Sequence, residues 1–167
     1  MRWLIDGYNV IRRDPDLRGA EERGLESGRR ALLALVAGAA RRSTDRFTVV
    51  FDGAPGGAPT GSHGQVETLF SRPPQKADDV LARLAREGRE GAVVVTSDRT
   101  VADAARRAGC PVVGAEAFVV ALSGGGDDDD ADDDDEDDRP ATRGGNPRRR
   151  SREERAARRA LDRLRRG

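Results

Sequence analysis

Short apolar runs alternate with longer amphipathic segments over the first 122 residues of the chain. Five of the runs are short and rich in Val, Ile or Phe, which is typical of β-strands. They lie at residues 2–5, 47–51, 66–70, 92–96 and 112–114. Several of them lack the alternation of polar and apolar positions that is expected when one strand face meets water. We therefore expect a mainly parallel sheet that is covered by helices on both faces.

The segments between these runs carry apolar residues at helical spacing. They predict helices at about residues 21–42, 77–87, 100–108 and 116–122. Residues 53–64 hold five Gly, two Pro and the only His, a composition that predicts a surface loop. The alternation of strands and helices predicts an α/β domain of three layers around a sheet of about five strands.

Charge is distributed unevenly along the rest of the chain. The totals balance at 30 basic and 30 acidic residues, but residues 127–138 hold 11 acids, and residues 139–167 hold 12 Arg against three acids. A self-repelling acidic segment that cannot form an apolar core does not offset its own conformational entropy. The sequence therefore predicts a domain at residues 1–122, a disordered acidic linker at 123–149 and a basic helix at 150–167. The apolar stripe of that helix can dock on the domain or on a partner.

Composition also excludes several classes of protein. Cys110 is the only cysteine, so neither a disulfide within the chain nor a cysteine-based zinc site can form. No apolar run approaches the roughly 20 residues that a membrane helix needs. No Gly-rich phosphate loop follows a predicted strand, which argues against a nucleotide cofactor. We expect a cytoplasmic protein without a membrane or a nucleotide cofactor among its partners.

Acidic residues follow the predicted strands repeatedly. Asp6, Asp52 and Asp98 come at or just after the ends of three strands, while Asp78 and Asp79 open the helix after a fourth. In a parallel sheet the carboxyl ends of the strands meet at one edge, which is the usual functional edge. Clustered carboxylates repel unless a cation lies among them. Mg²⁺ or Mn²⁺ takes oxygen ligands and stabilises charge on phosphate, so the pattern points to phosphodiester hydrolysis.

Helix capping is the alternative explanation for part of this pattern. Carboxylates are favoured in the first turn of a helix, which suits Asp78 and Asp79, and Asp98 can cap the helix that follows it. Capping does not explain Asp6 or Asp52, which end strands. Because adjacent helical residues point about 100° apart, Asp78 and Asp79 cannot both face one ion directly. We expect one of them to act through water or RNA.

Four short motifs in order carry a resemblance to a known family. They are Asp6-Gly7-Tyr8-Asn9-Val10-Ile11, Val49-Val50-Phe51-Asp52-Gly53, Ala77-Asp78-Asp79 and Val95-Thr96-Ser97-Asp98. Together they resemble the YacP-like branch of the NYN domain family, which is related to the PIN-domain nucleases. The resemblance covers residues 1 to about 122, and the basic C-terminal helix also resembles that branch.

The resemblance implies a PIN-like fold and metal-dependent cleavage of RNA by an endoribonuclease. The branch includes a ribosome-associated enzyme of mRNA decay, so mRNA and the ribosome are the implied partners. Asp6, Asp78 and Asp98 match the acidic metal-binding positions, with Asp52 and Asp79 as supporting acids. Asn9 matches the motif asparagine. By its chemistry Asn9 can donate to a phosphate oxygen or orient a carboxylate, and its alternative is a turn residue.

Basic residues near the acidic motifs are candidates for binding the RNA backbone. They are Arg12, Arg13, Lys76 and Arg99. The Arg cluster that begins with Arg148, Arg149 and Arg150 is a further candidate, since basic blocks commonly bind nucleic acid. Two other functions stay open at this point: a non-catalytic RNA- or ribosome-binding adaptor, and a metal-dependent phosphohydrolase of small substrates.

Overall fold

A six-stranded sheet forms the centre of the computed structural model, which describes residues 1–53, 61–123 and 151–166. Its order is β3-β4-β2-β1-β5-β6, and every neighbouring pair is parallel except β3 with β4. The strands are β1 (Arg2–Asp6), β2 (Arg46–Phe51), β3 (Gly61–His63), β4 (Val66–Phe70), β5 (Ala92–Val95) and β6 (Val112–Val113). The mostly parallel α/β sheet confirms the expected fold class.

The sheet has one strand more than the sequence predicts. β3 (Gly61–His63) pairs with β4 and falls inside the segment at 53–64 that we expected to be a loop. Its three residues, Gly-Ser-His, carry no apolar pattern, so periodicity gives no signal there. Residues 54–60 of the expected loop lie outside the described residues.

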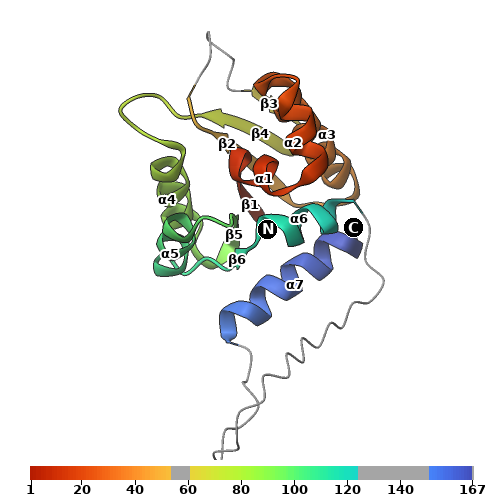
Figure 1. Ribbon diagram of the computed structural model, residues 1–167. Coiled ribbons are helices and arrows are strands. Elements are labelled where there is room, and N and C mark those ends of the chain that lie inside the picture. The colour runs from red at the N-terminus through yellow and green to blue at the C-terminus, as the bar shows by residue number, and fades with distance from the viewer. Residues whose placement is uncertain (54–60, 124–150, 167) are drawn as a thin grey trace, which may run out of the picture.

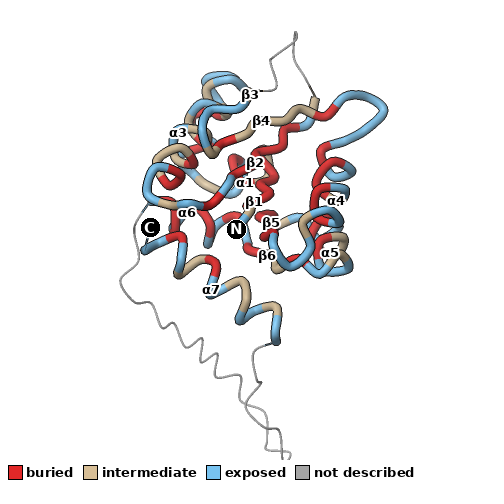
Figure 2. The backbone as a smooth tube through the Cα atoms, turned by 180° about the vertical axis from the view of Figure 1, so that it is seen from behind, coloured by how far each residue is buried: buried red, intermediate tan, exposed pale blue. Residues whose placement is uncertain are grey.

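Helices cover both faces of the sheet, as Figures 1 and 2 show. One face carries α4 (Ala77–Gly88) and α5 (Arg99–Arg107), which pack around Leu4, Val50 and Val94. The other face carries α1 (Gly7–Arg13), α2 (Pro15–Glu22), α3 (Leu25–Arg42), α6 (Ala115–Leu122) and α7 (Arg152–Arg166). The larger core lies on this second side and contains Trp3 and Phe47. The three layers agree with the sequence-based expectation.

The first connection differs from the single long helix expected at 21–42. α3 confirms most of that helix but begins only at Leu25, and the unpredicted α2 lies before it, separated from it at Gly24, which has a φ of 132°. That positive φ is strained for any side chain and ends α2. Helix α1 was not predicted, because seven residues are too few to establish an amphipathic pattern.

The C-terminal helix α7 packs on the domain rather than standing apart from it. Ala160 and Leu164, each 1% exposed, belong to the larger core, and Figure 1 shows α7 beside α6. An ion pair reinforces the contact, since Arg163 Nη2 lies 3.2 Å from Oδ1 of the fully buried Asp45. The sequence left open whether the apolar stripe of this helix docks on the domain or on a partner, and in the structure it docks on the domain. Of the predicted linker at 123–149, all but Ser123 lies outside the described residues.

Strand register places the ends of β1, β2 and β5 at the same level. Asp6 pairs with Val50, and Ile5 pairs with Val95, so the residues that follow these strands leave one edge of the sheet together.

In the described part of the chain, no helix is both long enough and apolar enough to cross a membrane.

Candidate active site

A pocket lies at the carboxyl edge of the sheet, where three strands and one helix contribute acidic side chains. Asp6 ends β1, Asp52 follows β2, Asp98 follows β5 and Asp78 lies in the first turn of α4. All four line a cavity of about 390 Å³. The structure thus brings together the acids that the sequence placed at this edge.

Asp6 is the most buried carboxylate of the pocket, with 8% of its surface exposed. Its Oδ1 accepts a hydrogen bond of 3.4 Å from the Asn9 backbone N–H, and its Oδ2 accepts one of 2.9 Å from the Thr96 hydroxyl. Burial, with smaller contributions from the charges of Asp78 and Asp98, raises the pKa of Asp6 to about 6 despite these two donors. Asp6 therefore carries its charge at a cost to stability.

The expectation that capping does not explain Asp6 is wrong. Asp6 is the N-cap of α1, a helix that the sequence did not reveal. Gly7 lets this helix begin directly after the strand, because a Cβ at that position would lie 2.3 Å from the Phe51 ring. Asp6 thus has a capping role in addition to its place in the pocket.

Asp98 and Asp78 line the same pocket as Asp6. Asp98 caps α5 through Oδ1, which accepts from the backbone N–H groups of Thr100 at 2.8 Å and Val101 at 3.1 Å. Burial and then the charge of Asp98 raise the pKa of Asp78. Asp98 is therefore both a cap, as the alternative explanation held, and a pocket carboxylate.

Asp52 is held at the rim by hydrogen bonds. The Ser71 hydroxyl donates to Asp52 Oδ1 at 2.6 Å, and the Ala77 backbone N–H donates to the same atom at 3.2 Å. The hydrogen bond from Ser71 is the main cause that lowers the pKa of Asp52. Capping does contribute here, since the Ala77 N–H belongs to the start of α4. Asp52 links the end of β2 to the helix that carries Asp78.

Asn9 lies in α1 rather than in a turn, and its side chain is fixed. Its Oδ1 accepts a hydrogen bond of 2.7 Å from the Ser97 backbone N–H. The amide N–H groups of Asn9 are then its remaining donors, and Asn9 lines the cavity. The arrangement suits contact with an anionic group in the pocket.

Two of the predicted site residues do not line the pocket. Asp79 turns back to its own helix, where its Oδ2 accepts from the Lys76 backbone N–H at 3.0 Å in a capping arrangement. Arg99 is an exposed residue at the start of α5. The structure therefore separates Asp79 from Asp78, as the angle between adjacent helical residues predicts.

Three of the predicted cations do line the pocket: Arg12, Arg13 and Lys76. The Arg12 guanidinium lies 5.7 Å from the centre of the Tyr8 ring, and Arg13 lies 3.8 Å from Glu116. Tyr8 packs edge-on against Phe51 and also lines the pocket. Arg148, Arg149 and Arg150 lie outside the described residues.

Sequence analysis missed two hydroxyl residues that organise the site. Thr96 is 2% exposed, donates to Asp6 and accepts from the Asp98 backbone N–H at 3.1 Å. Ser71 is 1% exposed and holds Asp52. The position of Thr96 at the end of a buried strand, two residues before Asp98, was the one available signal.

The donor chemistry of the pocket fits a hydrated divalent ion. Asp6, Asp78 and Asp98 supply hard carboxylate oxygens. The charges of Asp78 and Asp98 contribute to the raised pKa of Asp6, and the charge of Asp98 contributes to that of Asp78, so a cation relieves this repulsion. Within the described residues, no three Asp, Glu, His or Cys side chains lie close enough to hold a metal ion together. Mg²⁺ keeps several waters and needs only one or two direct carboxylates, so this spacing is compatible with it.

Comparisons with known proteins agree with this architecture. Two crystal structures of Rae1 (YacP) from Bacillus subtilis are similar to this chain, with TM-scores of 0.63 and 0.62 at 26% and 25% identity. Each comparison covers 74% of this chain and 74% of the other. A search of curated proteins found no match.

A family model extends the agreement to nearly the whole sequence. The model of the YacP-like NYN domain matches residues 3–166, a range that includes α7. NYN domains are PIN-like, which implies a nuclease that acts on RNA. The chain belongs to the YacP-like NYN domain family.

Proposed function

We propose that this protein is a metal-dependent endoribonuclease that cleaves RNA at the carboxyl-edge pocket. The observation that carries the proposal is the convergence of Asp6, Asp78 and Asp98 in one pocket, where the burial of Asp6 and the repulsion between neighbouring carboxylates favour a cation among them. Perturbed carboxylates in a cleft are typical of functional sites. The family to which the chain belongs gives the pocket its substrate class.

Asp6, Asp78 and Asp98 would hold a hydrated Mg²⁺ or Mn²⁺, with one or two of them in direct contact with the ion and the rest acting through its waters. When bound, such an ion makes water a stronger nucleophile and offsets charge on phosphate oxygens. Thr96 orients two of the three carboxylate positions, because its hydroxyl bonds Asp6 and the backbone of Asp98. Asp52 and Asp79 act indirectly, since both bind backbone N–H groups at the start of α4 and so fix Asp78.

The remaining lining residues bind the substrate backbone. Asn9 donates its amide N–H groups to a phosphate oxygen while Ser97 fixes the orientation of the amide. Arg12, Arg13 and Lys76 supply positive charge around the pocket for the neighbouring phosphates. Arg99 at the start of α5 extends this charge beyond the pocket.

We infer that the substrate is mRNA, cut in the cytoplasm in contact with the ribosome. The sequence motifs of the YacP-like branch support this finer assignment. It predicts that ribosome-bound mRNA is cut at defined positions where isolated mRNA is a poorer substrate.

Cleavage of labelled mRNA, alone and on translating ribosomes, tests both levels of the proposal. Wild type is compared with Asp98→Asn in Mn²⁺ or in chelator. Asn keeps the cap of α5, so the variant should fold while losing at least about 100-fold in rate, or about 3 kcal/mol of barrier. Asp103→Asn is the matched control, because Asp103 lies in the same helix and pairs with Arg106 outside the pocket.

Each result bears on a different part of the proposal. Metal-dependent cuts that require Asp98 but not Asp103 support the endoribonuclease. Bound RNA or ribosomes without cleavage in any metal would replace it by the adaptor. Equal cutting with and without ribosomes would remove the ribosome from the proposal and leave the enzyme.

A further inference from the structure

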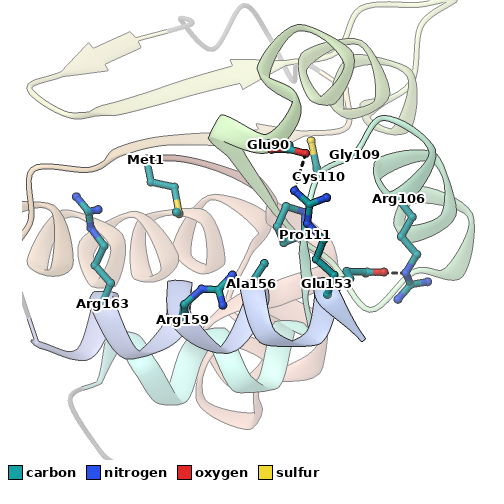
Figure 3. A pocket seen from close by; sticks show the side chains of 11 residues that line it. Met1, Glu90, Arg106, Gly109, Cys110, Pro111, Glu153, Ala156, Arg159 and Arg163 are labelled. Carbon is teal, nitrogen blue, oxygen red and sulfur yellow. Dashed lines mark hydrogen bonds and ion pairs between the residues drawn. The ribbon is translucent and has the colours of Figure 1, made fainter. Parts of the chain in front are cut away.

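A second pocket lies at the amino edge of the sheet, where α7 packs against the domain. It is a cavity of about 540 Å³ between the residues before β1, β5 and β6 and one side of α7. Four arginines line it: Arg106, Arg152, Arg159 and Arg163. The close view in Figure 3 shows Arg106, Arg159 and Arg163 around the cavity, with the last two projecting from α7.

Positive charge exceeds negative charge in this lining. Arg106 donates to Glu153 at 2.8 Å, and Arg152 donates to Glu90 at 3.3 Å. These two glutamates are the acids that line the cavity, against four arginines. Arg159 makes no ion pair with any residue in the described ranges. Since Arg163 pairs with the buried Asp45, Arg159 is the guanidinium of this lining that stays available to an anion.

The excess continues along α7 beyond the pocket. Arg159, Arg163 and Arg166 line an adjoining surface hollow together with Asp162. Residues three and four positions apart lie on one side of a helix, so these arginines form a row with about one guanidinium per turn. A row of this kind suits a chain of anions better than a single anion.

The charge balance of the carboxyl-edge pocket is a reason to expect a second surface that binds RNA. Its lining has four aspartates against Arg12, Arg13 and Lys76, a balance that does not by itself attract a polyanion. Guanidinium groups bind phosphates in a bidentate manner, and backbone contacts supply most of the non-specific affinity for nucleic acid.

We propose that Arg159 and Arg166, with the pocket that α7 closes, bind phosphates of the RNA backbone at a distance from the cleavage site. The inference rests on the proposed function for its choice of RNA. It assigns α7 a role in substrate affinity as well as in the core. Arg163 stays with Asp45 and anchors the helix.

RNA binding by matched double variants tests the proposal. Arg159→Ala/Arg166→Ala is compared with Arg30→Ala/Arg83→Ala, which removes two arginines from exposed ion pairs on α3 and α4. All proteins carry Asp98→Asn, and the probe is a 20-nucleotide unstructured RNA titrated at several salt concentrations. The α7 variant should bind about tenfold more weakly, with a salt slope reduced by about 1.4 for two lost contacts. The control should match the parent.

Three further measurements test whether the ligand is RNA and distinguish this proposal from the proposed nuclease function. Arg159→Lys/Arg166→Lys should recover the salt slope, which a folding defect would not do. An affinity and slope equal to those of the control would overturn the proposal, as would poly-glutamate of equal charge displacing RNA equally well. Wild type is assayed for cleavage separately: absent cleavage with weakened α7 binding removes the enzyme and keeps the surface.

Discussion

Asp6 and Asp45 are both buried carboxylates, and they lie at opposite ends of β1. Asp45 is fully buried and is surrounded by donors, since it accepts from the Trp3 indole at 3.1 Å and pairs with Arg163 at 3.2 Å. Asp6 is nearly as buried, but its charged neighbours are the carboxylates of Asp78 and Asp98. One aspartate joins α7 to the sheet, and the other stands in a pocket of like charge.

The difference separates a structural carboxylate from a functional one. When a buried and hydrogen-bonded charge loses its partner, the fold is strongly destabilised. A buried charge that has no partner in the native fold lowers its stability from the outset. Proteins accept such a local cost at functional sites. The same isosteric substitution, Asp to Asn, should therefore have opposite effects on stability at the two ends of the strand.

Asp45→Asn should give the largest loss of stability. The substitution removes the buried charge that accepts from Trp3 and pairs with Arg163, and a hydrogen bond to a charged group contributes about 1.5 to 3 kcal/mol. Urea unfolding measures the loss, and limited trypsin digestion should show earlier cleavage within α7. Asp103→Asn, which breaks only an exposed pair with Arg106, is the control and should change little. Equal stability of the Asp45 variant and wild type would remove the contrast.

Asp6→Asn should have the opposite sign. The raised pKa of about 6 means that the charged Asp6 costs the metal-free fold up to about 3 kcal/mol at neutral pH. Asn removes that charge and keeps the cap of α1, so the free energy of unfolding in chelator should rise while cleavage is lost. Asp52→Asn is the contrasting control, because hydrogen bonds lower the pKa of Asp52 and its neutralisation should lower stability. A destabilised Asp6 variant would contradict the assignment.

The same carboxylate should make the stability of the metal-free protein depend on pH. Folded Asp6 binds its proton up to about pH 6, while the unfolded group releases it near 3.8. Unfolding free energy should therefore fall as pH rises through 6, by about 1.4 kcal/mol between pH 5 and pH 8. Asp78, whose pKa is also raised, adds to this trend.

Unfolding in chelator at pH 5, 6 and 8 measures the dependence. Asp6→Asn should flatten most of it. Mn²⁺ at pH 8 should stabilise wild type and leave the Asp6 variant unchanged, because only a carboxylate site gains from the ion. If the unfolding free energy of wild type rises from pH 5 to pH 8, the charge on Asp6 does not destabilise the metal-free fold.

Much of the fold and part of the site follow from the sequence pattern. Buried strands have few polar positions, and acids at the ends of parallel strands meet at one edge, which places Asp6, Asp52, Asp78 and Asp98 in one pocket. α1, α2 and β3 were missed because elements of seven, eight and three residues are too short to establish a period. The missed helix α1 in turn hid the capping role of Asp6.

Other parts of the structure depend on contacts that no local pattern encodes. Thr96 and Ser71 act through single hydroxyls, which have no periodic signal. Asp45 is one acid between a helix and a strand, and its partner Arg163 is one of 12 arginines after residue 138. Only the packing of α7 against the sheet brings these two residues together.

Glu116→Gln should have the smallest effect and completes the comparison of the two edges. Glu116 pairs with Arg13 at 3.8 Å beside the acidic pocket, and both side chains are 54% exposed, whereas Asp45 in the pair with Arg163 is 0% exposed. Exposed ion pairs contribute about 0 to 1 kcal/mol, and Gln can still accept the hydrogen bond from Ser97. Urea unfolding should therefore show a change below about 0.5 kcal/mol. A loss comparable with that of Asp45→Asn would mean that burial does not separate the two ion pairs.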